Sequence, residues 1–177
     1  MKYSNQKLIL DADGLNSLAI YANVENLKEK KCDVLITPHL KEFVRLSGLS
    51  MAEIKSSPVA LAREFAKKYE ISLLLKGAST IITNGEKTCL NVTGTSAQAR
   101  GGSGDVLSGL IGGLCAQGLS LLDGACLGSY LVGVAAELAT EKLTEYVALP
   151  SDFIEFFGGA FKKVLSIPEN ADEYGGN

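Results

Sequence analysis

The feature that most constrains the fold is a series of short apolar runs in which polar and apolar residues do not alternate. The runs are Leu8–Leu10, Val34–Ile36 and Ile71–Leu75, and patterns with helical spacing lie between them. Strands that are apolar on both faces are typical of a parallel sheet that helices cover on both sides. The sequence therefore predicts an α/β fold built on a mostly parallel sheet.

Helical patterns and one hairpin signal complete the predicted architecture. We expect helices over residues 15–27 and 39–46, from Pro58 through Tyr69, and over 105–117, 121–143 and 151–165. Asn84-Gly85 lies between two short strands, 80–83 and 88–91, and this dipeptide favours a hairpin because it tolerates positive φ angles. The hairpin would add antiparallel strands at one edge of the sheet.

Length and charge narrow the classes of protein. The 177 residues predict a single domain over residues 1–166, and the acidic, glycine-containing tail over 167–177 is expected to be disordered. A formal net charge of −3 provides no field to hold a polyanion, so we expect no nucleic-acid partner. No stretch approaches the ~18 consecutive apolar residues of a membrane span, and the apolar run before Asp11 is too short for a signal peptide. We therefore expect a cytoplasmic protein without a membrane partner.

Cysteine and glycine usage predicts packing rather than cross-links. The four cysteines are scattered, form no C-x-x-C pair and share the chain with one histidine, which predicts free thiols rather than a disulfide framework or a zinc site. Glycine inside a helix costs ~1 kcal/mol relative to alanine, so close approach of helices or backbone must offset it. The recurring helical glycines are Gly109, Gly112, Gly113, Gly118, Gly124, Gly128 and Gly133.

Polar residues follow each predicted strand. Ligands of open α/β sheets gather at the carboxyl ends of the strands, so we expect these residues to converge on one edge. Two aspartates that are two residues apart would point the same way in an extended chain, although a turn and a helix cap would explain them equally well. For the histidine and the glutamate the structural alternative is a capping arrangement at a helix start, and for the lysine it is a solvated position in a loop. The residues are Asp11, Asp13, His39, Glu42, Lys76 and Asn91.

The most specific local motif is the run Gly101-Gly102-Ser103-Gly104-Asp105 at the start of a helical pattern. Glycines allow a ligand to approach the backbone, and a helix start presents unpaired N–H groups and the positive end of the helix dipole. The run therefore predicts a site for a phosphate or an oxyanion, and Asp105 is either a helix-initiating carboxylate or a general base that hydrogen bonds to N–H groups keep ionised. The alternative is a helix cap whose glycines serve tight packing.

These motifs occur in one order, as segments 10–16, 35–42, 74–80 and 91–107. The series resembles the ADP-dependent NAD(P)H-hydrate dehydratases, a branch of the ribokinase-like superfamily that is often labelled as carbohydrate kinases. The resemblance extends from about Leu8 to Ile154. It implies a ribokinase-like α/β fold, and because the family carries further strands before the first motif, it also implies that the chain lacks the N-terminal part of the domain.

The resemblance implies a lyase that restores NADH or NADPH from the hydrated cofactor while ADP, or ATP in some branches, is hydrolysed to AMP or ADP and phosphate. Mg²⁺ would accompany the nucleotide, with Glu42 as an outer ligand. Asp105 would deprotonate the ring hydroxyl so that it attacks the terminal phosphoryl group. By the same resemblance His39, Asp13, Asn16 and Asp105 would contact the hydrated dinucleotide. The nucleotide would contact Lys76, Gly77, Ala78, Ser79, Thr80, Gly101, Gly102, Ser103 and Gly104.

The chain departs from the family pattern at several positions. Leu40-Lys41 stands where Pro-Gly is usual, Thr95-Ser96-Ala97 stands where Asn-Pro-Gly is usual, Arg100 precedes the glycines, and Val132 replaces a common histidine. Two other readings remain: a ribokinase-like kinase of a small alcohol such as a sugar or vitamin precursor, and a truncated fragment that binds nucleotide without turnover. An exposed edge strand and an uncovered sheet face favour association, so we also expect a homo-oligomer.

Overall fold

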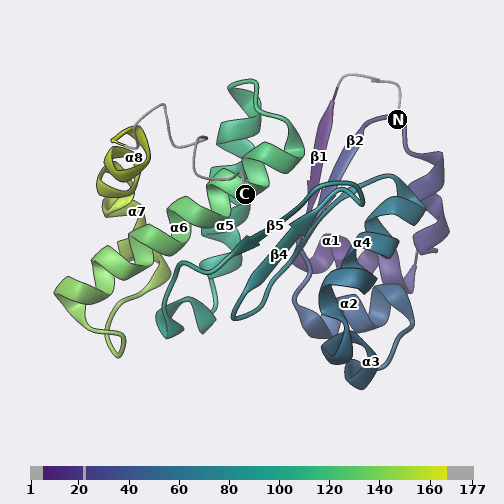
Figure 1. The fold of residues 1–177 in the computed structure, drawn as a ribbon, viewed down its shortest axis with the longest axis horizontal. Coiled ribbons are helices and arrows are strands. Elements are labelled where there is room, and N and C mark those ends of the chain that lie inside the picture. The colour runs from purple at the N-terminus through teal and green to yellow at the C-terminus, as the bar shows by residue number, and fades with distance from the viewer. Residues whose placement is uncertain (1–5, 22, 167–177) are drawn as a thin grey trace, which may run out of the picture. The chain divides into compact units, whose positions relative to one another are not determined.

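The computed structural model describes residues 6–21 and 23–166, which form two compact units (Figure 1). Unit 1 contains the chain up to Val92 together with Leu107–Tyr130, and unit 2 contains Thr93–Val106 and the chain from Leu131 onward. Helices α5 (Ser103–Ala116) and α6 (Leu121–Leu143) each contribute to both units. The expected tail over 167–177 lies outside the described residues, and the single domain over 1–166 stays a prediction.

Unit 1 is built on a five-stranded sheet in the order β1-β2-β3-β4-β5. The first three strands pair in parallel, and β4 and β5 form an antiparallel hairpin that continues the sheet from β3. This arrangement confirms the predicted α/β class and the hairpin at one edge. The strands are β1 (Lys7–Leu10), β2 (Asp33–Ile36), β3 (Ser72–Leu75), β4 (Thr80–Thr83) and β5 (Thr88–Asn91).

Both faces of this sheet are covered, which explains why the inner residues of β2 and β3 are apolar on both faces. One face, with Val34 and Leu73, packs against the helices between β1 and β4. The other face, with Leu35 and Leu74, packs against the parts of α5 and α6 that belong to unit 1. The helices on the first face are α1 (Ala12–Ile20), α2 (Leu40–Ser47), α3 (Met51–Ser56) and α4 (Pro58–Tyr69), with the 3₁₀ helix η1 (Val24–Glu29) (Figure 1).

Two helix predictions require correction, and a third helix was not predicted. The helix expected over 15–27 is divided into α1 and η1, because the side chain of Asn23 accepts a hydrogen bond from the Glu25 N–H and starts a new helical segment. The helix expected over 151–165 is also two helices, α7 (Pro150–Glu155) and α8 (Phe157–Leu165), separated at Phe156. Helix α3 was not predicted, because six residues are too few to display a helical period.

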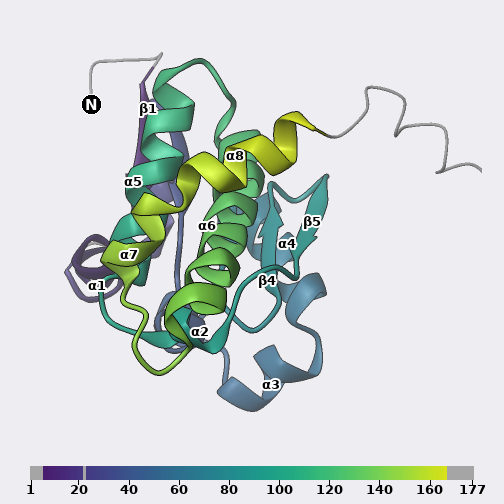
Figure 2. The same cartoon turned by 90° about the vertical axis from the view of Figure 1, so that its left-hand side faces the viewer.

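Unit 2 contains η2 (Ser96–Ala99), α7, α8, the first turn of α5 and the second half of α6. Its apolar interior includes Phe153, which is fully buried, and the small side chain of Ala160. Helix α8 crosses α6 (Figure 2), and Gly159 lies so close to Leu138 that a methyl group there would approach it to 2.9 Å. The backbone N–H of Gly94 donates to Glu137 Oε1 at 2.8 Å, which ties the start of this unit to α6.

Helix α6 is long and apolar enough, by length and composition alone, to cross a membrane. This property was not predicted, because α6 contains charged residues such as Asp123 and Glu137 and therefore no uninterrupted apolar run. Most of its apolar window, 61%, is buried inside the fold. Such burial is typical of a core helix.

The helical glycines have mixed roles. Gly124, Gly128 and Gly133 permit close approach as expected, because a Cβ atom at Gly124 would lie 2.6 Å from Cys115 Sγ. Gly109, Gly113 and Gly118 do not, since no atom from elsewhere in the described chain lies within 4 Å of the position of such a Cβ. At these three positions the packing prediction is wrong.

We expect Gly133→Ala to destabilise the protein by about 1–3 kcal/mol, because overpacking of a tight contact costs that amount. A Cβ atom at position 133 would lie 2.8 Å from the backbone carbonyl carbon of Thr93, which cannot move as a side chain can. The matched control is Gly113→Ala, which lies in open space and should stabilise its helix by about 0.5–1 kcal/mol. Urea denaturation measures both, and a Gly133→Ala variant as stable as the wild type would contradict this reading.

Candidate functional site

The loops after the parallel strands bring polar residues to one edge of the sheet in unit 1. Asp11 directly follows β1, His39 lies three residues after β2, and Lys76 directly follows β3. The β2–β3 pairing extends beyond the strands, because the Lys76 N–H donates to the Pro38 carbonyl at 2.8 Å and His39 forms an isolated parallel bridge with Lys76. The predicted convergence of these three residues on the carboxyl edge is confirmed.

The centre of this edge is an ion pair between Lys76 and Asp11. Lys76 Nζ lies 2.7 Å from Asp11 Oδ1, and the two side chains are 25% and 15% exposed. The other carboxylate oxygen of Asp11 accepts a hydrogen bond of 2.9 Å from Ser108 Oγ on α5. Burial acts to raise the pKa of Asp11, but the hydrogen bond and charge of Lys76, with the hydrogen bonds from Ser108 and Ala12, lower it overall. Because an ammonium has three N–H donors, Lys76 can hold Asp11 and still donate to an anion.

The turn after Asp11 shows that the two neighbouring aspartates are not arranged as predicted. Helix α1 begins at Ala12, so Asp11 and Asp13 do not lie in an extended chain and the premise of a shared direction is wrong. Asp13 lies exposed in the first helical turn, and Asn16 Oδ1 accepts a hydrogen bond of 2.9 Å from Arg45. Ala12 has a φ of 44°, a left-handed conformation that costs a residue with a Cβ about 1–2 kcal/mol. The Asp11 carboxylate is therefore held by a strained turn, a feature that concentrates at functional sites.

His39 and Glu42 form the capping arrangement that the sequence left open. His39 Nδ1 accepts from the Glu42 N–H at 3.1 Å, and Glu42 Oε2 accepts from the His39 N–H at 2.8 Å. Because Nδ1 accepts, the proton of the neutral imidazole is assigned to Nε2. The imidazole is 49% exposed, so its capping role leaves room for a ligand contact.

Glu42, which the family resemblance makes an outer ligand for Mg²⁺, has a buried carboxylate. No group of three or more His, Cys, Asp or Glu side chains that could hold a metal is present among residues 6–21 and 23–166. Mg²⁺ is commonly bound through one or two carboxylates together with substrate phosphates. The donor set therefore fits an ion that arrives with a nucleotide and not a metal cage made by the protein alone.

The glycine-rich turn lies in unit 2, at the start of α5. Gly102 has a φ of 96°, a conformation that favours glycine, and the helix begins at the next residue. The Oγ atom of Ser103 is buried and has no hydrogen-bond partner within the described part of the chain. A buried hydroxyl without a partner is costly, so this atom and the N–H groups of the first turn form a cradle suited to an anion.

Asp105 lies in the first turn of α5 with its side chain exposed. The expected hydrogen bonds from backbone N–H groups to its carboxylate are not found among the residues the structure describes. The turn itself is anchored by Arg100, whose guanidinium donates to the carbonyls of Glu145 and Tyr146 at 3.0 and 2.7 Å. Arg100, which departs from the family pattern, therefore supports the position of the glycines.

The remaining predicted residues have less specific surroundings. Gly77, Ala78 and Ser79 form an exposed loop, which Thr80 closes with a hydrogen bond of 3.4 Å to the Gly77 carbonyl. Ser108 and the buried hydroxyl of Ser103 are the groups that the sequence reasoning missed or undervalued. Ser108 could have been noticed as a polar residue in the apolar stretch after Asp105, but its contact with Asp11 spans 97 positions and has no local signal.

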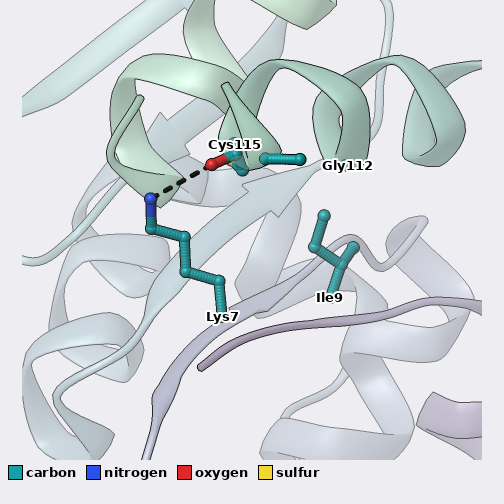
Figure 3. Close-up of a pocket in the computed structure, with 5 residues that line it drawn as sticks. Lys7, Ile9, Gly112 and Cys115 are labelled. Atoms are coloured by element: carbon teal, nitrogen blue, oxygen red, sulfur yellow. Dashed lines mark hydrogen bonds between the residues drawn. The ribbon is translucent and has the colours of Figure 1, made fainter. Parts of the chain in front are cut away.

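Two cavities lie away from these residues. A cavity of about 320 Å³ is lined by Lys7, Ile9, Gly112 and Cys115 between β1 and α5 (Figure 3), and Lys7 also donates to the Cys115 and Leu119 carbonyls. A second cavity of about 420 Å³ lies at the amino ends of β2 and β3. Neither is lined by a residue that the sequence assigns to the site, so neither of these two cavities belongs to the polar edge.

The ion pair predicts a specific dependence of stability on pH. Because the folded-state pKa of Asp11 lies below its ordinary value of 3.8, the pair contributes stability that is present above that value and lost as pH falls through the folded pKa. We expect Asp11→Asn to lower the urea midpoint at about pH 7 and to flatten its decline toward about pH 3. The matched control Asp13→Asn, an exposed carboxylate, should follow the wild type. Parallel declines in the wild type and Asp11→Asn would contradict the assignment.

Comparison with known proteins identifies the class of protein to which this chain belongs. The chain is a ribokinase-like α/β protein, as its sheet with an edge hairpin and its flanking helices indicate. It belongs to the NAD(P)H-hydrate dehydratase family, whose profile matches residues 1–156. The expectation drawn from the ordered motifs is thereby confirmed.

Particular relatives agree with this assignment. The ADP-dependent (S)-NAD(P)H-hydrate dehydratase of Neisseria meningitidis serogroup B is 34% identical over 79% of this chain and 48% of its own length. The bifunctional NAD(P)H-hydrate repair enzyme of Moorella thermoacetica is 37% identical over 84% of this chain and 28% of its own length. The Bacillus subtilis ADP/ATP-dependent NAD(P)H-hydrate dehydratase, co-crystallised with ATP and Mg²⁺, superposes with a TM-score of 0.77 at 29% identity, over 89% of this chain and 55% of that one. The chain therefore spans about half the length of the Neisseria enzyme, 48%, and a smaller share of the Moorella enzyme, 28%.

Proposed function

We propose that this chain carries the nucleotide-binding and proton-accepting part of a dehydratase that returns hydrated NADH or NADPH to the reduced cofactor, with hydrolysis of ADP or ATP. The observation that carries the proposal is the glycine turn at the start of α5, with the buried, unpartnered hydroxyl of Ser103. A helix start of this kind stabilises the negative charge of a transferring phosphoryl group. Membership of the family supports the same substrates.

In the proposed reaction Asp105 accepts the proton of the ring hydroxyl, and the resulting oxygen attacks the terminal phosphorus of the nucleotide. The bond from that phosphorus to its bridging oxygen breaks, and AMP leaves when the nucleotide is ADP. The new phosphate ester then departs, driven by the lone pair of the ring nitrogen, and the dihydropyridine is restored. The exposure of Asp105 suits it for contact with a bound hydroxyl.

The polar edge of unit 1 would bind the charged parts of the ligands. Lys76 would donate to a phosphate, while the loop from Gly77 to Thr80 would contact the nucleotide and His39 the dinucleotide. We include Asp13 and Asn16 as contacts of the dinucleotide. Mg²⁺ would neutralise charge on the nucleotide phosphates, with Glu42 as the carboxylate available to it. The assignments of these residues rest on family resemblance and on the positions described above.

One assay tests the proposal and separates it from its alternatives. The purified chain is incubated with ADP or ATP, Mg²⁺ and hydrated NADH, and absorbance at the reduced nicotinamide band is followed. Return of NADH that depends on nucleotide supports the dehydratase. Phosphorylation of a small alcohol without NADH return would indicate a kinase instead. Nucleotide binding without any turnover would indicate a fragment that needs the remaining half of the domain.

We also assign the protein to the cytoplasm and expect it to self-associate. Free cysteines in the described part of the chain are typical of a reducing compartment. Strand β1 lies at the edge of the sheet in unit 1, where unpaired backbone groups provide a template for contact with another chain. The measured mass in solution tests the association, and a monodisperse monomer would contradict it.

A further inference from the structure

Two cysteines that the proposed reaction does not use lie near each other in unit 1. Cys89 lies on β5 and is exposed, whereas Cys126 lies on α6 and is half-buried. The two thiols are close enough for Cys89 to affect the pKa of Cys126. The two residues are far apart in the sequence, so the spacing of the cysteines did not predict that they lie close together.

A neighbouring contact shows independently that these two surfaces face each other. Asn91, two residues after Cys89, donates from Nδ2 to the carbonyl oxygen and Oγ of Ser129 at 3.1 and 3.0 Å. Residues two apart lie on one face of a strand, and residues three apart lie on one side of a helix. Cys89 therefore faces α6 beside Asn91, and Cys126 faces β5 one turn before Ser129.

The packing beneath the pair supports the same placement. Cys126 packs against the apolar cluster that contains Ile82, and Ile82 is the residue on β4 that pairs with Cys89. The pair therefore lies at the margin of this cluster, with one sulfur accessible to solvent and the other backed by apolar side chains. A small oxidant cannot approach a buried thiol, but it can approach a pair of thiols in which one member is exposed.

We propose that Cys89 and Cys126 form a reversible disulfide under oxidising conditions, which makes the junction of β5 and α6 a redox-sensitive modification site. The oxidant is a peroxide. The Cys89 thiolate attacks one peroxide oxygen, a sulfur–oxygen bond forms, the oxygen–oxygen bond breaks, and the leaving hydroxide takes a proton to become water. The Cys126 thiol then attacks the sulfenic sulfur, the sulfur–sulfur bond forms, and the hydroxyl leaves with the Cys126 proton as a second water.

The order of the two steps follows from the surroundings of each sulfur. Burial, together with the neighbouring Cys89, raises the pKa of Cys126 to about 12, so Cys126 remains a thiol. The exposed Cys89 is consequently the first sulfur to react, and Cys126 is the resolving group. Cys32 and Cys115 are buried, and burial also raises the pKa of Cys115, so we expect neither to react.

The disulfide would fix the end of β5 against α6. Asn91 is the last residue of β5, two positions beyond the cross-link. A cross-link that closes a long loop lowers the entropy of the unfolded chain and so stabilises the folded one. For a chain of this size the expected rise in melting temperature is about 10 °C.

The test uses the full chain, treated with a small excess of hydrogen peroxide and analysed by mass spectrometry without reduction. We expect loss of two hydrogen atoms, a cross-linked peptide that joins Cys89 to Cys126, and a raised melting temperature that a dithiol reductant reverses. Cys89→Ser and Cys126→Ser should each abolish the cross-link and the shift, whereas Cys32→Ser should retain both. Because Cys89 is exposed, the Cys89→Ser protein should match the wild type in its reduced melting temperature.

Some results would overturn the proposal. These are a cross-linked peptide that contains Cys32 or Cys115, a dimer joined between chains, or sulfinic acid at Cys89 without a disulfide. A cross-link that forms without any change in melting temperature would remove the claim that it fixes β5 to α6. None of these outcomes depends on NADH return, so the result stands apart from the test of the proposed activity.

Discussion

The Asp105→Asn variant is expected to lose the nucleotide-dependent return of NADH by at least ~10²-fold, the loss typical of a missing general base. Asparagine keeps the size and polarity of the side chain but cannot accept the hydroxyl proton. Nucleotide affinity should change by no more than a few-fold, because the cradle is formed by the glycine turn and Ser103. Turnover by absorbance and nucleotide affinity by calorimetry provide the two measurements.

A second helix offers a matched control for a merely structural role. Asp123 is the third residue of α6, as Asp105 is the third residue of α5, and it takes part in a capping interaction with Ser120 at 2.6 Å. Asp123→Asn should weaken that helix start by about 0.5–1 kcal/mol and leave turnover unchanged. If Asp105→Asn likewise lowers only stability, Asp105 is a helix-initiating carboxylate and not the base.

The strands and the polar edge could be predicted from the sequence, because each depends on local patterns of residues. Leu35 and Leu74 face one apolar cluster while Val34 and Leu73 face another, so the inner residues of the parallel strands are apolar on both faces and the strands are recognisable as buried. The rule that ligands gather at carboxyl ends then requires only that the strands be parallel. Strand order was not needed for that step, and it was not predicted.

The partners of the polar residues were not accessible, since they depend on which strands and helices become neighbours. Asp11 pairs with Lys76 across 65 positions of the sequence, and no local pattern encodes that distance. The break between α1 and η1 was not predicted for a different reason. The break at Asn23 arises from one side chain that competes with the helix, and a periodic apolar pattern continues through such a break.

The Lys76→Met variant is expected to lose nucleotide affinity by about 10–100-fold, which corresponds to removal of a charge-assisted hydrogen bond of ~1.5–3 kcal/mol. The substitution also leaves the partly buried Asp11 carboxylate without its cation. We therefore expect a loss of about 1–3 kcal/mol in the free energy of unfolding as well. Calorimetry with ADP or ATP and urea denaturation measure the two effects separately.

The double variant Lys76→Met with Asp11→Asn separates binding from folding. With both charges removed, no unpaired carboxylate remains buried, so much of the stability lost in Lys76→Met should return. Nucleotide affinity should stay low, because the ammonium that we propose as the phosphate contact is still absent. Affinity that recovers together with stability would show that Lys76 acts only through the fold. Ser108→Ala, which removes the other hydrogen bond to Asp11, should change affinity far less than either variant that lacks the lysine, since Ser108 contacts the carboxylate and leaves the ammonium in place.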